Sequence, residues 1–131
     1  MNRNTERICI RGVYFDKVTM QSAFAAAKDL ISSEGFDYVF TPNSEIVQNC
    51  IEDNALYEII NSASLIIPDG IGVIYASKIL GRPLPEKVAG FDLSKRILSY
   101  AAETKKRVFL LGSAPATNET RAVCDIAAEK I

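Results

Sequence analysis

The sequence predicts an α/β fold in which a mainly parallel sheet is covered by helices. Strand-like apolar runs alternate along the chain with segments of helical periodicity, and parallel neighbouring strands need crossovers that such helices supply. Two of the runs also break off into polar side chains, as strands do at the ligand-binding edge of an open α/β sheet. With 131 residues, 48% of them hydrophobic, we expect a single domain over 1–131 with an ordinary core.

The first half of the chain predicts a strand or hairpin, a helix, a second strand and a divided helix. ICIRGVYF (8–15) has β-branched and aromatic residues around a glycine, which is typical of strands and hairpins. Thr19 precedes apolar residues at helical spacing, so it is expected to cap a helix that Gly35 ends. DYVFT (37–41) predicts a short strand, and a helix begins near Glu45 and is interrupted at Asn54.

The next segment predicts a strand, a helix and a loop. SLIIP (64–68) is the strand, and Asp69-Gly70 opens a helix through Leu80. Apolar residues run nearly all round that helix, which is usual for a buried one. Glycine and two prolines make GRPLPEK (81–87) a loop.

The last third predicts a helix, a strand and a final helix. Asp92 is expected to cap the first helix, which basic residues close where the helix dipole favours them. RVFLLG (107–112) is predicted as a clear strand, and Gly112-Ser113 leads into a helix that reaches Ile131. Because the sequence stops there without a cap or a following strand, we expect a fragment of a longer chain.

Composition excludes several classes of function. Fifteen basic and sixteen acidic side chains nearly balance, so the charge does not favour nucleic acid as a partner. The absence of histidine excludes Ser-His-Asp and Cys-His catalysis and histidine-ligated zinc. The sequence has no GxGxxG, Walker A, GxSxG or DxD motif, which argues against dinucleotide, P-loop and hydrolase classes and against a metal held by paired aspartates.

The three cysteines and the apolar segments bear on location. Cys9, Cys50 and Cys124 are widely spaced and form no metal-ligand pattern, so we expect buried thiols in a reducing cytosol. No apolar stretch approaches the roughly 20 residues of a membrane span. We therefore expect a cytoplasmic chain, or one peripheral to a membrane.

Asp69 is the strongest candidate for chemistry. It stands where a strand must turn into a helix, and Gly70 and Gly72 would let a substrate approach the backbone closely. A carboxylate in this position can act as a general base. The alternative is that Asp69 only caps the helix that follows.

The other candidate residues each have a functional and a local interpretation. Thr41 and Asn43 offer a hydroxyl and an amide that can orient a sugar, or they serve the turn before the helix. Arg82 and Lys87 could neutralise a diphosphate, or they lie on a solvated loop. Gly112-Ser113 could present backbone amides to a phosphate, or form an ordinary turn.

Three segments together resemble the WecG/TagA/CpsF family of bacterial glycosyltransferases. They are TPNSEIV (41–47), PDGIGVIYASKILGRPLPEKVAGFDL (68–93) and VFLLGSAP (108–115). The resemblance implies a Rossmann-like α/β fold and an inverting sugar transfer that needs no metal or other cofactor. It implies a UDP-sugar donor, such as UDP-N-acetylmannosamine, and the 4-hydroxyl of undecaprenyl-diphosphate-linked N-acetylglucosamine as acceptor, in cell-surface polymers such as teichoic acid.

The resemblance also implies roles for individual residues. Asp69 takes the place of the family's proposed base, and Thr41 and Asn43 take places in its substrate pocket. Lys87 stands where the family usually has an arginine thought to contact a diphosphate, and lysine keeps the charge without bidentate geometry. The family chain continues with further strands and a basic appendage that meets the inner face of the cell membrane, so the expected domain is incomplete.

Three functional hypotheses follow. The first is a membrane-peripheral glycosyltransferase with Asp69 as base. The second is a non-catalytic UDP-sugar-binding or assembly module that keeps half of the fold. The third is a generic phosphate-binding Rossmann-like enzyme. An exposed sheet edge would also favour homo-oligomers.

Overall fold

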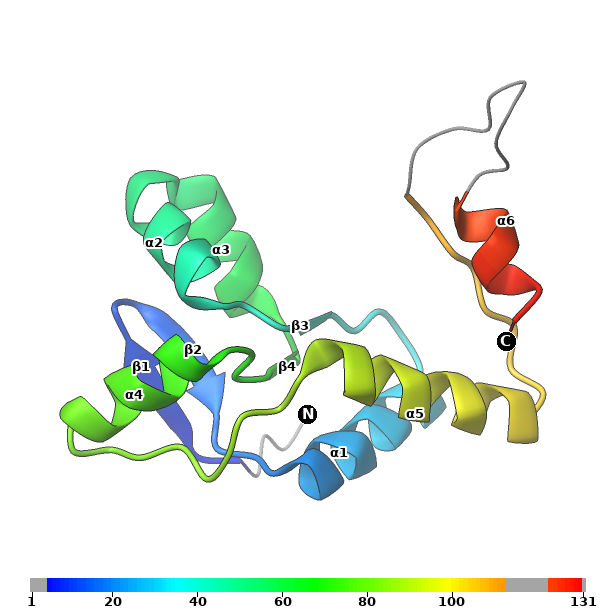
Figure 1. Ribbon diagram of the computed structural model, residues 1–131, viewed down its shortest axis with the longest axis horizontal. Coiled ribbons are helices and arrows are strands. Elements are labelled where there is room, and N and C mark those ends of the chain that lie inside the picture. The colour runs from blue at the N-terminus through cyan, green and yellow to red at the C-terminus, as the bar shows by residue number, and fades with distance from the viewer. Residues whose placement is uncertain (1–4, 113–122, 131) are drawn as a thin grey trace. The chain divides into compact units, whose positions relative to one another are not determined.

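The computed structural model describes residues 5–112 and 123–130 (Figure 1). The chain divides into two compact units, Met1–Ser94 and Lys95–Ile131. The strands of the described residues all lie in the first unit, which contains a strand hairpin and a parallel strand pair with their associated helices. This unit also holds most of the residues that the sequence singled out.

The predicted hairpin is confirmed by strands β1 (Arg7–Ile10) and β2 (Val13–Asp16), which pair antiparallel. Arg11 and Gly12 connect them with φ of 49° and 93°, as a two-residue turn between twisted antiparallel strands requires. Their apolar side chains form one side of the core: Ile8, Ile10, Val13 and Phe15 are all buried. The sheet is therefore anchored by its buried face.

The predicted parallel pairing is also found. Strand β3 (Val39–Phe40) lies parallel to β4 (Leu65–Ile66). Helices α2 (Ser44–Glu52) and α3 (Asn54–Ser62) form the crossover between them, and Asp53 separates the two helices by capping α3. Because the strands are parallel, both carboxyl ends lie at one edge of the pair.

Helix α1 (Met20–Ser32) begins as predicted, because Thr19 and Ser22 form a reciprocal capping box. Helix α4 (Ile71–Ile79) differs from the prediction of a buried helix. It buries Val73, Ile74 and Ser77, but Ile71, Tyr75 and Ile79 on its other side are exposed. Apolar residues stand on both sides of this helix, so the sequence did not reveal that only one side packs against the core.

The core of the first unit lies among the hairpin, α2, α3, β4 and α4. Of the three cysteines expected to be buried, Cys50 belongs to this core, whereas Cys9 and Cys124 are only partly buried. Burial raises the pKa of the Cys50 thiol above the ordinary value, and the nearby Asp53 carboxylate adds to the shift. The folded protein therefore holds this thiol proton to higher pH than an ordinary cysteine does.

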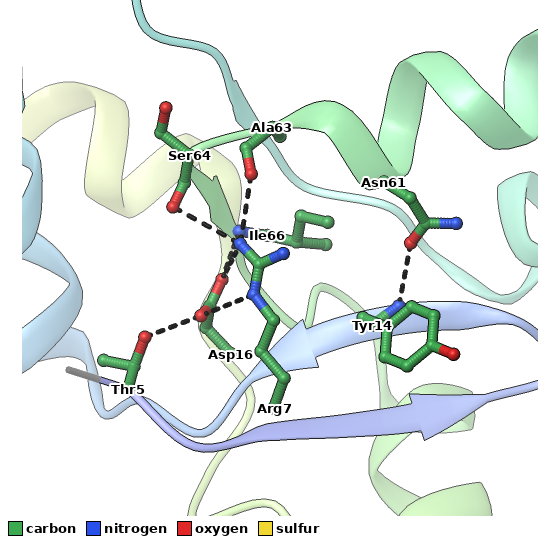
Figure 2. Close-up of polar contacts among 8 residues, drawn as sticks. All are labelled: Thr5, Arg7, Tyr14, Asp16, Asn61, Ala63, Ser64 and Ile66. Carbon is green, nitrogen blue, oxygen red and sulfur yellow. Dashed lines mark hydrogen bonds and ion pairs between the residues drawn. The ribbon is translucent and has the colours of Figure 1, made fainter. Parts of the chain in front are cut away.

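An ion pair between the partly buried Arg7 and the buried Asp16 ties the hairpin to β4 (Figure 2). The Arg7 guanidinium donates from Nε and Nη2 to the two oxygens of Asp16 at 3.0 and 3.1 Å. Nη2 also donates to the carbonyl of Ala63 at 3.0 Å, and the Ile66 amide donates to Asp16 Oδ2 at 2.8 Å. Charged groups that are buried need such partners, so this network is structural.

In the second unit the structure differs from the predicted strand over 107–112. Helix α5 (Gly90–Glu103) crosses from the first unit into the second, which also contains α6 (Val123–Ala128). Between these helices no described residue from 107 to 112 pairs as a strand, and Phe109 and Leu111 are 85% and 90% exposed. A strand needs a neighbour for its backbone groups, and apolar composition does not supply one.

The described residues thus form a mixed α/β structure with one antiparallel and one parallel pair of strands. Helix α5 also begins at Gly90, three residues before the start that a cap at Asp92 predicts, and its first amide donates to Asp69 and not to Asp92. Within the described residues, no helix is both long and apolar enough to cross a membrane.

Candidate functional site

The predicted site residues of the two strand ends come together at one edge of the parallel pair. β3 leads into Thr41 and Asn43, and β4 leads into Asp69 and Gly70. A Cβ atom placed on Gly70 would lie 3.6 Å from Cβ of Asn43, so the two segments are in contact. This edge is where open α/β sheets bind their ligands.

Asp69 does not cap the helix that follows it. Gly70, with φ of 97°, precedes α4 and makes no side-chain cap bond. Asp69 Oδ2 instead accepts a hydrogen bond of 3.1 Å from the amide of Gly90, the first residue of α5. Its other oxygen, Oδ1, accepts no bond from the described residues, and the side chain is only partly buried. One oxygen is therefore held in place while the other is available for chemistry.

Gly90 is a site residue that the sequence reasoning missed. A Cβ there would lie 2.9 Å from both Cγ2 and Oγ1 of Thr41 and 3.1 Å from its Cβ. Real Cβ atoms are essentially never this close to such neighbours, so a larger residue at position 90 would displace the Thr41 side chain. The signal was present in the sequence as a glycine two residues before the expected helix cap.

Asn43 caps helix α2, which is the local role that its position in the sequence allowed. Its Oδ1 accepts a hydrogen bond of 3.0 Å from the amide of Ile46 and so caps α2. The side chain is nevertheless exposed, and its amide nitrogen donates to no group in the described residues. The cap fixes the side chain and turns the NH2 group into a fixed donor at the edge of the site.

Lys87 lies in the segment that connects α4 to α5. The next residue, Val88, donates its amide to the carbonyl of Pro68 at 2.9 Å, which places the Lys87 backbone close to the end of β4. Lys87 is exposed and forms no ion pair with the described residues. Arg82, at the other end of the segment, is also exposed.

The remaining two candidates are Gly112 and Ser113. Gly112 belongs to the second unit, where it is exposed and has φ of 120°. Ser113 lies outside the described residues. The site of the first unit therefore consists of Thr41, Asn43, Asp69 and Gly70, with Lys87 beside it along the chain.

A cavity of about 240 Å³ adjoins the amino-terminal turns of α2 and α4. It lies next to the site, because Ser44 directly follows Asn43, Gly72 follows Gly70 after one residue, and Ser44 and Gly72 are themselves in contact. Apart from Gly72, which was expected to let a substrate approach, the sequence reasoning gave no role to its lining residues, which are Ile10, Arg11, Ser44, Val47, Gln48, Gly72, Val73 and Ala76. In the described part of the chain, no group of three or more acidic, histidine or cysteine side chains could hold a metal ion.

A carboxylate, a hydroxyl and an amide at the ends of adjacent parallel strands define a small-molecule site of the kind that α/β enzymes carry. Residues 8–129 match the Glycosyl transferase WecG/TagA/CpsF family. The chain therefore belongs to this family, and the resemblance stated from the three sequence segments is confirmed.

Curated relatives come from Staphylococcus aureus, among them proteins of strains NCTC 8325 / PS 47, COL and MSSA476. Each is named N-acetylglucosaminyldiphosphoundecaprenol N-acetyl-beta-D-mannosaminyltransferase and is 38% identical to this chain over 118 residues. The match covers 88% of this chain and 45% of each relative. The chain thus spans a little under half the length of the curated relatives it matches.

Proposed function

We propose that this chain carries the catalytic base of an inverting, metal-independent glycosyltransferase. The donor is a UDP-sugar, UDP-N-acetylmannosamine or a close relative, and the acceptor is N-acetylglucosamine on undecaprenyl diphosphate, in the synthesis of a cell-surface polymer such as teichoic acid. The observation that carries the proposal is the Asp69 carboxylate, which is held through Oδ2 by the Gly90 amide and leaves Oδ1 unbonded within the described residues. The names of the 38% identical relatives support the substrate class.

In the proposed reaction, Asp69 Oδ1 takes the proton from the acceptor's 4-hydroxyl. The hydroxyl oxygen attacks the anomeric carbon of the donor from the face opposite UDP, its new bond replaces the bond to the UDP oxygen, and UDP leaves. One displacement of this kind inverts the anomeric configuration. The fixed orientation of the carboxylate favours the proton transfer, because general bases act over hydrogen-bond distances.

The neighbouring residues have matching roles in this proposal. Thr41 and the Asn43 NH2 group orient sugar hydroxyl or acetamido groups, while Gly70 lets the substrate approach the backbone. The Lys87 ammonium neutralises a diphosphate. Gly112 and Ser113 are proposed, from their place before a sequence-predicted helix, to present backbone amides to a phosphate.

The proposed fold is a single Rossmann-like catalytic domain over 1–131, incomplete relative to the full family domain. The parallel β3–β4 pair with its helical crossover supports it. The proposed place of action is the inner face of the cell membrane, because the proposed acceptor is anchored in lipid. Self-association would use exposed apolar side chains such as Ile71, Tyr75 and Ile79 of α4.

Transfer of labelled N-acetylmannosamine from its UDP derivative to a synthetic lipid-diphosphate N-acetylglucosamine tests this function. The assay uses the 131-residue chain and a chimaera in which it replaces the matching part of a Staphylococcus aureus relative, with that relative as positive control. We expect transfer by the chimaera in the presence of EDTA, with inverted anomeric configuration in the product. No transfer by a folded chimaera would contradict the proposal, and binding of UDP-sugar by the chain without any turnover would favour the assembly module.

A further inference from the structure

The segment that joins α4 to α5 is anchored at every second residue. Two of these anchors are hydrogen bonds to Ser77 of α4. The Arg82 amide donates to the Ser77 carbonyl and the Leu84 amide donates to the Ser77 hydroxyl, each at 3.0 Å. Two more anchors are hydrogen bonds to the segment that follows β4. The Val88 amide donates to the Pro68 carbonyl at 2.9 Å, and the Gly90 amide donates to the Asp69 carboxylate at 3.1 Å. Leu84, Val88 and Gly90 are also buried. We call this anchored segment, residues 82–90, the strap.

Glu86 supplies the middle anchor of the strap, and it does so with its side chain. Its carboxylate accepts a hydrogen bond from the backbone amide of Met20, the first residue of α1. The first amides of a helix have no partner within the helix, and a negative charge at this end is favourable. The contact joins residues 66 positions apart and fixes the strap to a different helix from the one it leaves.

Lys87 therefore lies between two consecutive anchors. Glu86 is bound to α1 on one side, and Val88 is bound to the carbonyl that precedes Asp69 on the other. The Lys87 side chain itself is exposed and forms no ion pair with the described residues. The backbone of this lysine is held in place while its charge stays available to a ligand.

We propose that Glu86 is a positioning residue, which holds Lys87 at the edge of the Asp69 site for binding to the diphosphate group of a substrate. The ligand class rests on the function proposed above, whereas the positioning rests on the strap contacts. Without Glu86 the middle of the strap loses its attachment to α1, and the backbone around Lys87 must be ordered when the ligand binds. Ordering a backbone segment costs conformational entropy, which weakens the binding.

Charge and positioning make opposite predictions for Glu86. Removing a carboxylate next to Lys87 makes the surroundings more positive, so charge alone would strengthen the binding of an anion. Loss of the anchor would weaken it. Glutamine at this position removes the charge and keeps a carbonyl oxygen that can accept from the Met20 amide, so it separates the two effects.

The experiment is a titration of the 131-residue chain with inorganic pyrophosphate, followed through backbone amide signals by NMR. We expect Glu86→Ala to weaken binding about three- to tenfold, Glu86→Gln to bind as tightly as the parent or more tightly, and Lys87→Ala to lose most of the binding. Glu58→Ala is the matched control, because Glu58 is an exposed glutamate on α3, and it should bind like the parent. Thermal unfolding of each variant separates loss of binding from loss of fold.

Binding by Glu86→Ala that equals or exceeds the parent's would overturn the positioning role, and so would equal weakening in Glu86→Ala and Glu86→Gln. If Lys87→Ala binds pyrophosphate like the parent, or the parent does not bind it, the ligand assigned to the strap is wrong. The transfer assay with the lipid-linked acceptor is scored separately, so the proposed sugar transfer can fail while the strap result stands, and the reverse.

Discussion

Asp16 and Asp69 are two carboxylates that the fold uses in opposite ways. Asp16 is 1% exposed, and its two oxygens accept four hydrogen bonds, from Thr5, from Arg7 twice and from the Ile66 amide (Figure 2). Asp69 is partly exposed, and within the described residues it accepts one, from the Gly90 amide. A carboxylate whose acceptor positions are occupied serves the fold, whereas we propose that one held by a single oxygen at the sheet edge serves the reaction. The predictions below test this distinction.

The largest effect is expected for Asp16→Ala. It leaves the Arg7 charge and the Ile66 amide without their acceptor in a buried place, which typically destabilises a protein by about 3–5 kcal/mol. Urea unfolding measures the change, with Asp29→Ala, an exposed aspartate on α1, as the control. A loss below about 1 kcal/mol would show that the network contributes no more than a surface ion pair.

Gly90→Ala should destabilise the chain by about 1–3 kcal/mol, because the added Cβ meets Thr41 at 2.9 Å. Since Gly90 also holds Asp69, sugar transfer should fall as well. Combining the change with Thr41→Ala removes the two closest atoms and should restore part of the unfolding free energy. If the double variant is no more stable than the sum of the two single changes predicts, the close contact with Thr41 does not cause the destabilisation by Gly90→Ala.

Asn43 tests the amide at the edge of the site. Asn43→Ala removes the cap of α2 and should cost about 1 kcal/mol in unfolding free energy. Asn43→Asp keeps the cap but removes the NH2 donor, so stability should be retained while KM for a sugar substrate rises. Unchanged kinetic constants in Asn43→Asp would limit this residue to its role as a cap.

The smallest effect concerns Cys50. Burial raises the pKa of its thiol in the folded state, so the folded chain holds this proton to higher pH than the unfolded chain does. Its contribution to stability is therefore complete below the unfolded pKa of about 8.5 and is lost as the pH rises above it. Urea unfolding at rising pH should show a steeper loss of stability for the parent than for Cys50→Ala, and equal slopes would contradict this.

Features that depend on nearby residues were predictable from the sequence. The turn at Gly12, the cap at Thr19 and the break between α2 and α3 each depend on a few neighbouring side chains. The structure confirms the first two and places the break at Asp53, one residue before the predicted Asn54. The joining of Thr41 and Asn43 to the segment that carries Asp69 also followed, because parallel strands place their ends together.

Features that depend on distant partners were not predictable. The Gly90 amide that binds Asp69 is 21 residues away, and the amide that Glu86 caps is 66 residues away. Neither distance leaves a periodic signal in a single sequence. The same reason explains the segment over 107–112, whose apolar residues are typical of a strand although no described residue pairs with it.

The most direct test of the distinction between the two aspartates is Asp69→Asn, measured for both stability and sugar transfer in the chimaera. Asparagine keeps an oxygen that can accept from the Gly90 amide and loses the ability to take a proton. We predict that the unfolding free energy changes by less than about 1 kcal/mol, while the transfer rate falls by about 100-fold or more. Transfer at the parent rate would contradict the assignment of Asp69 as the base.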